Sequence, residues 1–214
     1  AGHKILVTGG AGGIGSEICR ALHRDGARLV IHYSTQRGPA EALAAEGPAS
    51  SVALQADLTD DRGPDELWDA ATRALGGIDV LVNNAGIGAA GDIAANPDAE
   101  WHRVWDVNVV GIARVTRATL PYLRRSDHAA IVNTCSIAGV AGLPNRALYS
   151  ATKGAVAALT YAMATDHVRE GIRVNAVCPV LVPTEGLIQA LKGPHSPAKG
   201  DLGGPDPGPE RSSQ

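Results

Sequence analysis

The sequence contains no phenylalanine, one methionine and only three cysteines, at positions 19, 135 and 178. An odd number of widely spaced cysteines excludes a disulfide framework and is typical of a reducing compartment, so we expect a cytoplasmic protein. No stretch approaches 18 consecutive apolar residues, and we therefore expect no membrane-spanning helix. The net charge of −3 argues against nucleic acid or an anionic membrane as the main partner. The histidines show no metal-ligand spacing, so no metal site is predicted.

Hydrophobic residues make up 44% of the chain, and most of them are Ala, Val, Leu and Ile. Short β-branched runs alternate with longer Ala-rich stretches, which predicts a Rossmann-like, doubly wound α/β fold with a parallel sheet of about six strands and helices on both faces. The predicted strands are Lys4–Thr8, Arg28–Tyr33, Ser51–Ala56, Ile78–Asn83, Ala129–Cys135 and Ile172–Cys178. The predicted helices cover residues 14–25, 38–46, 61–75, 97–124 and 148–169.

The composition changes near residue 193. Residues 193–214 are rich in Gly and Pro and have almost no apolar side chains. Such a segment cannot bury enough surface to offset its ordering entropy. We therefore predict one Rossmann-like domain over residues 1–192 and a flexible tail over residues 193–214.

A glycine-rich segment, Thr8–Gly15, follows the first predicted strand and leads into a helix. Glycine lets the backbone turn sharply and approach a pyrophosphate closely, and a helix N-terminus offers free N–H groups to the anion. We predict a dinucleotide site that includes Gly9, Gly13, Ile14 and Gly15. The alternative is a β–α turn without a ligand.

The end of the second strand has no acidic residue, although an acid there usually binds the ribose hydroxyls of NAD. Ser34 and Arg37 are suited to a 2′-phosphate, which favours NADP over NAD. Alternatively, Arg37 is a solvated loop charge. Asp57, followed by Leu58, comes directly after the third strand, and we assign both to the cofactor site. Asp57 either binds the adenine amino group or caps the strand end.

Tyr149 and Lys153 are four residues apart on a predicted helix and so project from one face. A nearby ammonium favours the phenolate, and a fall of about three units in the tyrosine pKa requires roughly 4 kcal/mol. Lys153 together with a cationic nicotinamide would supply it. Ser136 follows the fifth predicted strand, Asn84 follows the fourth, and Asn108 lies in the helix after the fourth. The carboxyl ends of parallel strands meet at one edge of the sheet. We therefore expect these side chains to converge in one crevice.

The pattern resembles that of the classical short-chain dehydrogenase/reductase family over residues 3–190. Each motif is weak by itself, but their order and spacing together are specific. The resemblance rests on TGGAGGIG at 8–15, NNAG at 83–86, Asn108, Ser136 and YSATK at 149–153.

The resemblance implies a role for each matching residue. Tyr149 would act as general acid in reduction and base in oxidation, and Ser136 would bind the substrate oxygen. Lys153 would bind the nicotinamide ribose, and Asn108 would hold a water in a proton relay. The cofactor contacts would come from Gly9, Gly13, Ile14, Gly15, Ser34, Arg37, Asp57, Leu58, Asn84, Ala85, Gly86, Tyr149, Lys153, Pro179 and Thr184.

The sequence departs from the family pattern after the sixth strand. Pro179 and Thr184 match, but Val180 stands where the family has glycine, and a β-branched residue resists positive φ and adds bulk. The family's substrate helix and seventh strand are not recognisable beyond residues 185–192. We therefore expect the sixth strand to be a bare edge.

Two functions follow from these observations. The first is an NADP-preferring oxidoreductase that interconverts a carbonyl and a secondary alcohol, such as a 3-oxoacyl-reductase-like or similar ketone reductase. The second is a catalytically impaired relative that serves as a nucleotide-binding or interaction module, which Val180 and the altered C-terminus would favour. In both cases the resemblance implies a homodimer or homotetramer, formed through the helices at 97–124 and 148–169.

Overall fold

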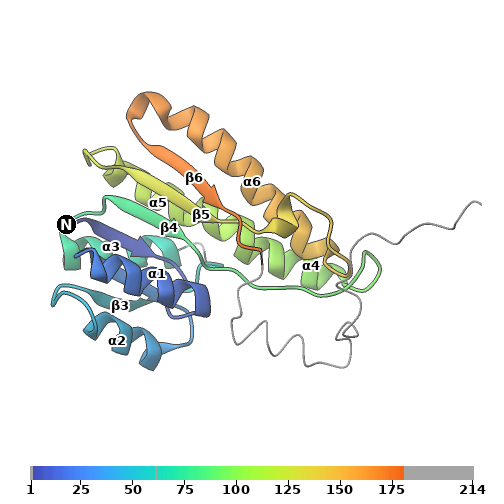
Figure 1. Cartoon of the computed structure of the whole chain (residues 1–214), viewed down its shortest axis with the longest axis horizontal. Helices are drawn as coiled ribbons and strands as arrows, with labels where there is room; N and C mark the ends of the chain where they lie inside the picture. Colours follow the sequence, from blue (N-terminus) through green and yellow to red (C-terminus); the bar gives the residue numbers. More distant parts are fainter. Residues whose placement is uncertain (1, 61, 181–214) are drawn as a thin grey trace, which may run out of the picture. The chain divides into compact units, whose positions relative to one another are not determined.

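The computed structural model describes residues 2–60 and 62–180, which form a parallel sheet surrounded by helices (Figure 1). Its strands are β1 (Lys4–Val7), β2 (Arg28–Tyr33), β3 (Val52–Gln55), β4 (Val80–Asn83), β5 (Ala130–Thr134) and β6 (Arg173–Val177). Its α-helices are α1 (Gly13–Arg24), α2 (Arg37–Ala45), α3 (Gly63–Leu75), α4 (Asp98–Trp105), α5 (Gly111–Leu123) and α6 (Ala147–His167). The predicted fold class is confirmed. No helix among these residues is long and apolar enough to cross a membrane.

The strand order is β3-β2-β1-β4-β5-β6, and every pairing is parallel. From β1 the chain adds strands outward to β3, and then returns to place β4 on the other side of β1. The carboxyl ends of all six strands lie at one edge of the sheet. The strand order reverses between β1 and β4, and sheets of this topology bind ligands outside the carboxyl ends of the strands at such a reversal.

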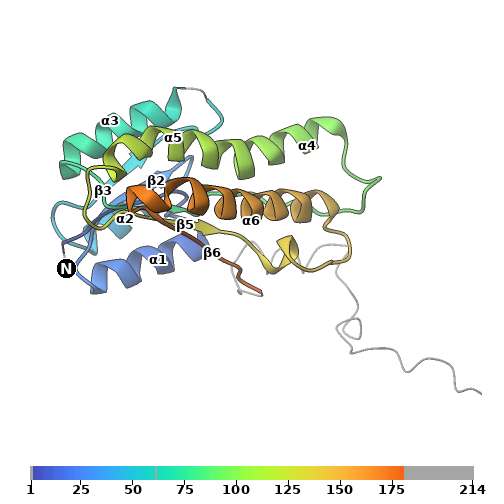
Figure 2. The ribbon, with the colours of Figure 1, turned by 90° about the horizontal axis from the view of Figure 1, so that it is seen from above.

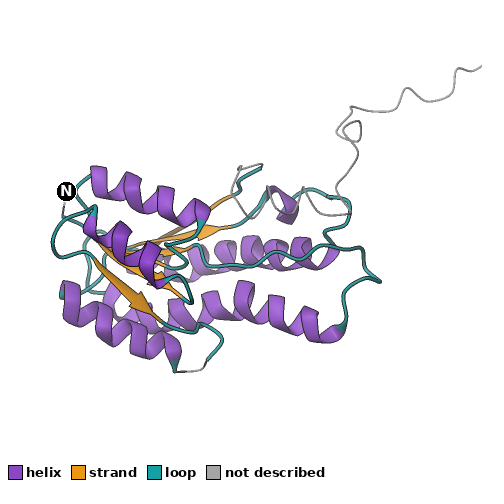
Figure 3. Cartoon of the chain, turned by 90° about the horizontal axis from the view of Figure 1, so that it is seen from below, coloured by secondary structure: helices purple, strands orange, loops and turns teal. Residues whose placement is uncertain are grey.

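The strands are buried on both faces over most of the sheet. Ile5, Val7 and Ile31 point toward α1 and α2, whereas Leu6 and Val30 point toward α3 and the longer helices. Figure 2 shows α1 on one side of the sheet and α3, α5 and α6 on the other, and Figure 3 shows the strands lying between layers of helices. This two-sided burial explains why the strands read as continuous apolar runs in the sequence.

The predicted helix at 97–124 has the expected extent but is not continuous. Between α4 and α5, residues Asp106–Val110 form a π-helical turn. A π turn widens the helix by one residue and is frequent at functional sites. Here it contains Asn108, which is fully buried.

β6 is one of the two edge strands of the described sheet, and β3 is the other. The burial of β6 alternates: Val174 is buried, while Arg173, Asn175 and Val177 are exposed. Among residues 2–180 no strand pairs with the outer side of β6, and the bare edge stays a prediction. Thr184, the segment at 185–192 and the predicted tail at 193–214 lie outside the described residues.

Candidate functional site

The loop between β1 and α1 is shaped by glycines that tolerate no side chain. Gly9 has a φ of 60°, and a Cβ there would lie 2.9 Å from Ala85 Cα. A Cβ on Gly15 would lie 2.2 Å from the Gly9 carbonyl oxygen. Both contacts are with backbone, which cannot move aside easily. The loop is therefore held close to the chain that follows β4.

The N-terminus of α1 is open to a ligand. Its N-cap is Gly12, no side chain caps it, and its first turn contains no acidic residue. Gly12 and Gly13 are exposed. Free N–H groups and the positive end of the helix dipole are the features that bind a pyrophosphate, so the loop fits a dinucleotide.

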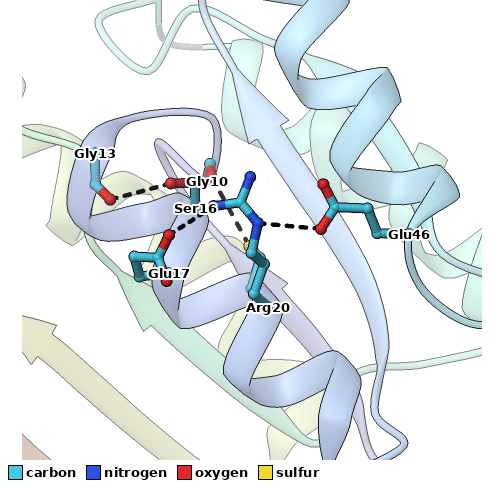
Figure 4. Close-up of polar contacts among 7 residues, drawn as sticks. Gly10, Gly13, Ser16, Glu17, Arg20 and Glu46 are labelled. Carbon is cyan, nitrogen blue, oxygen red and sulfur yellow. Dashed lines mark hydrogen bonds and ion pairs between the residues drawn. The ribbon is translucent and has the colours of Figure 1, made fainter.

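The cation nearest to this loop on α1 is already paired. Figure 4 shows Arg20, one turn beyond the loop, between Glu17 and Glu46 at 2.6 and 3.1 Å. Ser16 donates a hydrogen bond to the Gly13 carbonyl at 3.1 Å and does not cap the helix. Binding of a phosphate at this loop thus depends on backbone groups.

The chain after β4 is tied to the glycine loop by hydrogen bonds. Asn84 Nδ2 donates to the carbonyl oxygens of Thr8 and Gly9, both at 3.1 Å. The Thr8 hydroxyl accepts from the backbone N–H groups of Asn84 and Ala85 at 3.0 and 3.1 Å. A Cβ on Gly86 would lie 3.2 Å from Asn108 Oδ1 and 3.5 Å from Lys153 Nζ. This segment therefore connects the loop with the predicted catalytic residues.

The residues predicted to select the 2′-phosphate lie together at the end of β2. Ser34 is exposed, and Arg37 is the first residue of α2. Arg37 Nε donates to Glu41 at 2.8 Å, an exposed pair one helical turn apart. A bound phosphate would have to compete with Glu41 for this guanidinium. Tyr33, which ends β2 where an acid is often found, is buried.

At the end of β3, Asp57 caps the following turn. Its Oδ1 accepts hydrogen bonds from the Thr59 backbone N–H at 2.9 Å and the Thr59 hydroxyl at 2.7 Å. These bonds hold the pKa of Asp57 below its usual value. The capping interpretation of Asp57 is thus realised in the structure. Leu58 is buried in the core beside α3 and offers its carbonyl oxygen to Arg114 at 3.3 Å.

Lys153 is buried beneath Tyr149 at the start of α6. It is 4% exposed, and its Nζ donates to the Thr134 carbonyl at 2.7 Å. Nζ lies 5.8 Å from the centre of the Tyr149 ring. Burial lowers the pKa of Lys153. The spacing of four residues therefore brings the two side chains together, as predicted.

The structure does not show the expected fall in the pKa of Tyr149. Burial of the phenol raises this pKa, and hydrogen bonding with Ser136 opposes the rise only partly. The ammonium of Lys153 donates its hydrogen bond to the Thr134 carbonyl. A cationic nicotinamide beside the phenol would act in the opposite direction to burial.

Asn108 is held by three hydrogen bonds on the π turn. Oδ1 accepts from the Ile87 N–H at 2.8 Å, and Nδ2 donates to the Ile87 carbonyl at 2.9 Å and the Thr152 hydroxyl at 3.1 Å. Thr152 in turn donates to the Tyr149 carbonyl at 2.8 Å. Thr152 was not singled out from the sequence. Its place inside the YSATK motif is the signal by which it was identifiable.

Ser136 and Pro179 lie on neighbouring strand ends. The Ser136 hydroxyl accepts from the Ala138 N–H at 3.2 Å, and the Pro179 carbonyl accepts from Ile137 N–H at 3.0 Å. Val180 is 73% exposed, and its φ is not positive. Among the described residues other than glycine, a positive φ occurs at Asn145. The backbone strain expected at Val180 is therefore absent.

Within residues 2–60 and 62–180, neither a metal centre nor the cavity beside Lys4 forms part of the candidate site. No group of three or more His, Cys, Asp or Glu side chains there is placed to hold a metal ion. A cavity of about 360 Å³ lies at the amino ends of the strands, beside Lys4, Asp79 and Ser126. It is at the opposite edge of the sheet from the glycine loop and Tyr149, and is separate from the candidate site.

Comparison with known proteins points to one family. The short chain dehydrogenase family profile matches residues 3–193. The chain is 38% identical over 192 residues to 2-(S)-hydroxypropyl-CoM dehydrogenase 3 of Xanthobacter autotrophicus, covering 88% of this chain and 75% of that protein. It is equally identical, over 176 residues, to a protein of the same organism named inactive 2-(S)-hydroxypropyl-CoM dehydrogenase 2, covering 82% and 76%. Among solved structures, the NADP active-site complex of Pseudomonas aeruginosa RhlG matches with a TM-score of 0.83 and 31% identity, covering 92% of this chain and 79% of that one.

Proposed function

Because the chain belongs to the short-chain dehydrogenase family, we propose that it transfers a hydride between NADP(H) and a ketone or secondary alcohol, with Tyr149 as general acid and base. Family membership makes it a nicotinamide-nucleotide-dependent oxidoreductase with a small-molecule substrate. The proposal adds the preference for NADP, the substrate type and the residue roles. A bound nicotinamide would supply or accept the hydride.

The observation that carries the proposal is the meeting of three segments around Lys153. Its ammonium is one helical turn from Tyr149, bonded to the Thr134 carbonyl beside Ser136, and close to Gly86. In reduction the Tyr149 hydroxyl would donate a proton to the developing alkoxide, and in oxidation the phenolate would accept it. Ser136 would donate a hydrogen bond to the same oxygen.

The test of this role is Tyr149→Phe, with Tyr161→Phe as a matched control on the exposed part of α6. NADPH oxidation is followed with a panel of ketones, and nucleotide binding by thermal unfolding. We expect Tyr149→Phe to lose at least about 100-fold in kcat, because a positioned proton donor contributes about that much or more. Nucleotide stabilisation, about 2.7 kcal/mol at 100 times Kd, should remain. Equal turnover in the two variants would contradict the role.

The preference for NADP is supported by the lack of an acidic side chain at the end of β2. Ser34 and Arg37 are exposed there, and a solved relative binds NADP. Arg37→Ala should weaken NADPH binding and leave NADH binding unchanged. Glu41→Gln, which frees the Arg37 guanidinium, should strengthen NADPH binding. Equal changes of NADPH and NADH binding in Arg37→Ala would show that Arg37 does not contact the 2′-phosphate.

The second candidate is a catalytically impaired member of the family that binds nucleotide without turnover. It is favoured by Val180 at the usual glycine position and by the similarity to a relative that is named inactive. This candidate predicts that both nucleotides stabilise the chain, while no ketone accelerates NADPH oxidation. Val180→Gly should then produce turnover if the missing glycine is the cause.

We also propose that α4, α5 and α6 pair with a second copy of the chain. Trp105 is 39% exposed and Tyr161 is 74% exposed on these helices, and a second copy of the chain packed there would cover both side chains. Tyr161→Glu should shift the sedimentation of the protein toward a single chain. The domain boundary near residue 192 remains a proposal, which limited proteolysis followed by mass measurement would test.

A further inference from the structure

The imidazole of His32 joins the two loops that flank the nucleotide site. His32 lies on β2 and is 2% exposed. Its Nδ1 lies 3.0 Å from the Gly9 backbone nitrogen, and its Nε2 lies 3.1 Å from the Ala56 carbonyl oxygen. Its own carbonyl accepts from the Gly10 N–H at 2.9 Å. One residue thus contacts two successive amides of the glycine loop and the residue before Asp57.

These contacts determine the protonation state of His32. A backbone N–H can only donate, so Nδ1 must be the unprotonated acceptor for Gly9. A carbonyl can only accept, so Nε2 must carry the proton that is shared with Ala56. The neutral imidazole satisfies both partners at once. An imidazolium would point a second N–H at the N–H of Gly9 and break that hydrogen bond.

The surroundings favour the neutral form. Burial lowers the pKa of His32, while the Ala56 carbonyl and the negative charge of Asp57 raise it to a lesser extent. Arg114, on α5, in turn acts on Asp57. From α1, the Cys19 thiol faces Gly10 and stays uncharged, because burial raises its pKa to about 12. The lowered pKa and the hydrogen bonds to Gly9 and Ala56 thus favour the same neutral form of His32.

The bond to Gly9 matters because Gly9 is where the loop turns. Its φ of 60° and its close approach to Ala85 leave the backbone little freedom without losing contact with the chain after β4. A rotation of the Thr8–Gly9 peptide would move the Thr8 carbonyl, which accepts from Asn84 Nδ2 at 3.1 Å, and would disturb the adjoining Gly9 carbonyl, which accepts from the Gly12 N–H at 3.1 Å. The amides that would bind a pyrophosphate would then shift as a group.

We propose that neutral His32 is a positioning residue that holds the glycine loop in its nucleotide-binding conformation, and that protonation of His32 weakens nucleotide binding. The proposal rests on the nucleotide site of the proposed function. It concerns a residue that does not touch the nucleotide and acts through Gly9 and Gly10.

The experiment compares nucleotide affinity between about pH 5 and 8 in the full chain and four variants. His32→Asn places Oδ1 where Nδ1 lies, so it keeps an acceptor for Gly9 but cannot titrate. His32→Gln reaches toward Ala56 and lacks the acceptor for Gly9, and His32→Leu lacks both bonds. His23→Asn is the matched control, because His23 is also partly buried with a lowered pKa but binds Ser51, far from the loop.

Binding is measured with NADH, since the 2′-phosphate of NADPH titrates near pH 6 and would add its own pH dependence. We expect the wild-type and His23→Asn affinities to fall together as the pH decreases, by up to about tenfold per unit. His32→Asn should bind like wild type at pH 8 and keep that affinity at low pH. His32→Leu and His32→Gln should bind about 2- to 12-fold more weakly at pH 8, as expected for the loss of one hydrogen bond.

A wild-type pH dependence that persists in His32→Asn would overturn the proposal, as would wild-type affinity in a folded His32→Leu. Hydrogen exchange of residues 8–15 without nucleotide provides a second measurement. At one fixed pH it should be faster in His32→Leu than in wild type, and equal rates would also overturn the proposal. If wild type binds neither NADH nor NADPH at pH 8, the proposed function fails, and the exchange rates alone decide the role of His32.

Discussion

At the loop after β1 the site is made of backbone, whereas at the start of α6 it is made of side chains. Gly9 and Gly15 contribute close approach of the backbone, and α1 begins at Gly13 without a side-chain cap, all within seven consecutive residues. Lys153 and Asn108 contribute an ammonium and an amide, and they come from different helices. The backbone region depends on residues having no side chain. The side-chain region depends on how four distant segments pack. Substitutions in the two regions should therefore affect different properties of the protein.

The largest effect is expected from Gly15→Ala in the backbone region. The new Cβ would lie 2.2 Å from the Gly9 carbonyl oxygen and 2.8 Å from Asn84 Nδ2. We expect loss of stabilisation by NADPH and NADH, together with about 1–3 kcal/mol lower free energy of unfolding. Gly38→Ala is the control, since nothing lies within 4 Å of its Cβ position. Thermal unfolding with and without nucleotide measures both, and a nucleotide shift equal to that of Gly38→Ala would be inconsistent with a backbone cradle.

A smaller and more selective effect is expected from Gly139→Ala in the side-chain region. Gly139 follows Ser136, and a Cβ there would lie 2.6 Å from the Lys153 carbonyl carbon. Relief of this clash would move Ser136 away from Tyr149. We expect kcat to fall by roughly 100-fold, the cost of a displacement of about 1 Å, while the nucleotide Kd changes little.

The control for this variant is Gly142→Ala, which has nothing within 4 Å of the added Cβ. Steady-state kinetics and nucleotide titration separate the two quantities. If Gly139→Ala weakened nucleotide binding as strongly as Gly15→Ala does, the two regions would not be independent.

The smallest effect concerns Lys153 and pH. Burial lowers the pKa of Lys153 in the folded chain, so the unfolded chain binds more protons between that value and about 10.4. The free energy of unfolding of wild type, relative to Lys153→Met, should therefore rise with pH in that window, by at most about 1.4 kcal/mol per unit. Urea unfolding at pH 7 and at about pH 9.5 measures the difference. A relative stability that falls with pH would mean that the folded chain favours the ammonium.

The sequence predicted the backbone region better than the side-chain region. The glycines of the loop are adjacent in the chain, and the strand before them and the helix after them are local features. Residues Tyr149 and Lys153 were also identifiable, because their spacing of four residues is a helical turn. The partners of these residues were harder to identify. Thr152 bonds to Asn108, 44 positions away, and only its place in the YSATK motif pointed to it. His32 bonds to Gly9, 23 positions away, and no pattern along the chain marks that contact.

Electrostatics also required the structure. The sequence placed an ammonium near a phenol, and this suggested a lowered pKa for Tyr149. The folded chain buries the phenol, and this desolvation raises the pKa of Tyr149 by more than the hydrogen bond with Ser136 lowers it, while Lys153 donates to the Thr134 carbonyl. Burial depends on every element that surrounds a side chain, whereas spacing depends only on the helix that carries it.

By itself, the sequence determined the alternation of strands and helices, the parallel sheet and the position of the glycine loop. These follow from apolar periodicity and from glycine, which act over a few residues. Only the tertiary structure decided that Asn108 lies on a π turn, that Asp57 caps a turn, that Arg37 is paired with Glu41, and that His32 bridges two loops. Hydrogen-bond partners at this range are set by the packing of whole elements, and that packing is a property of the folded chain.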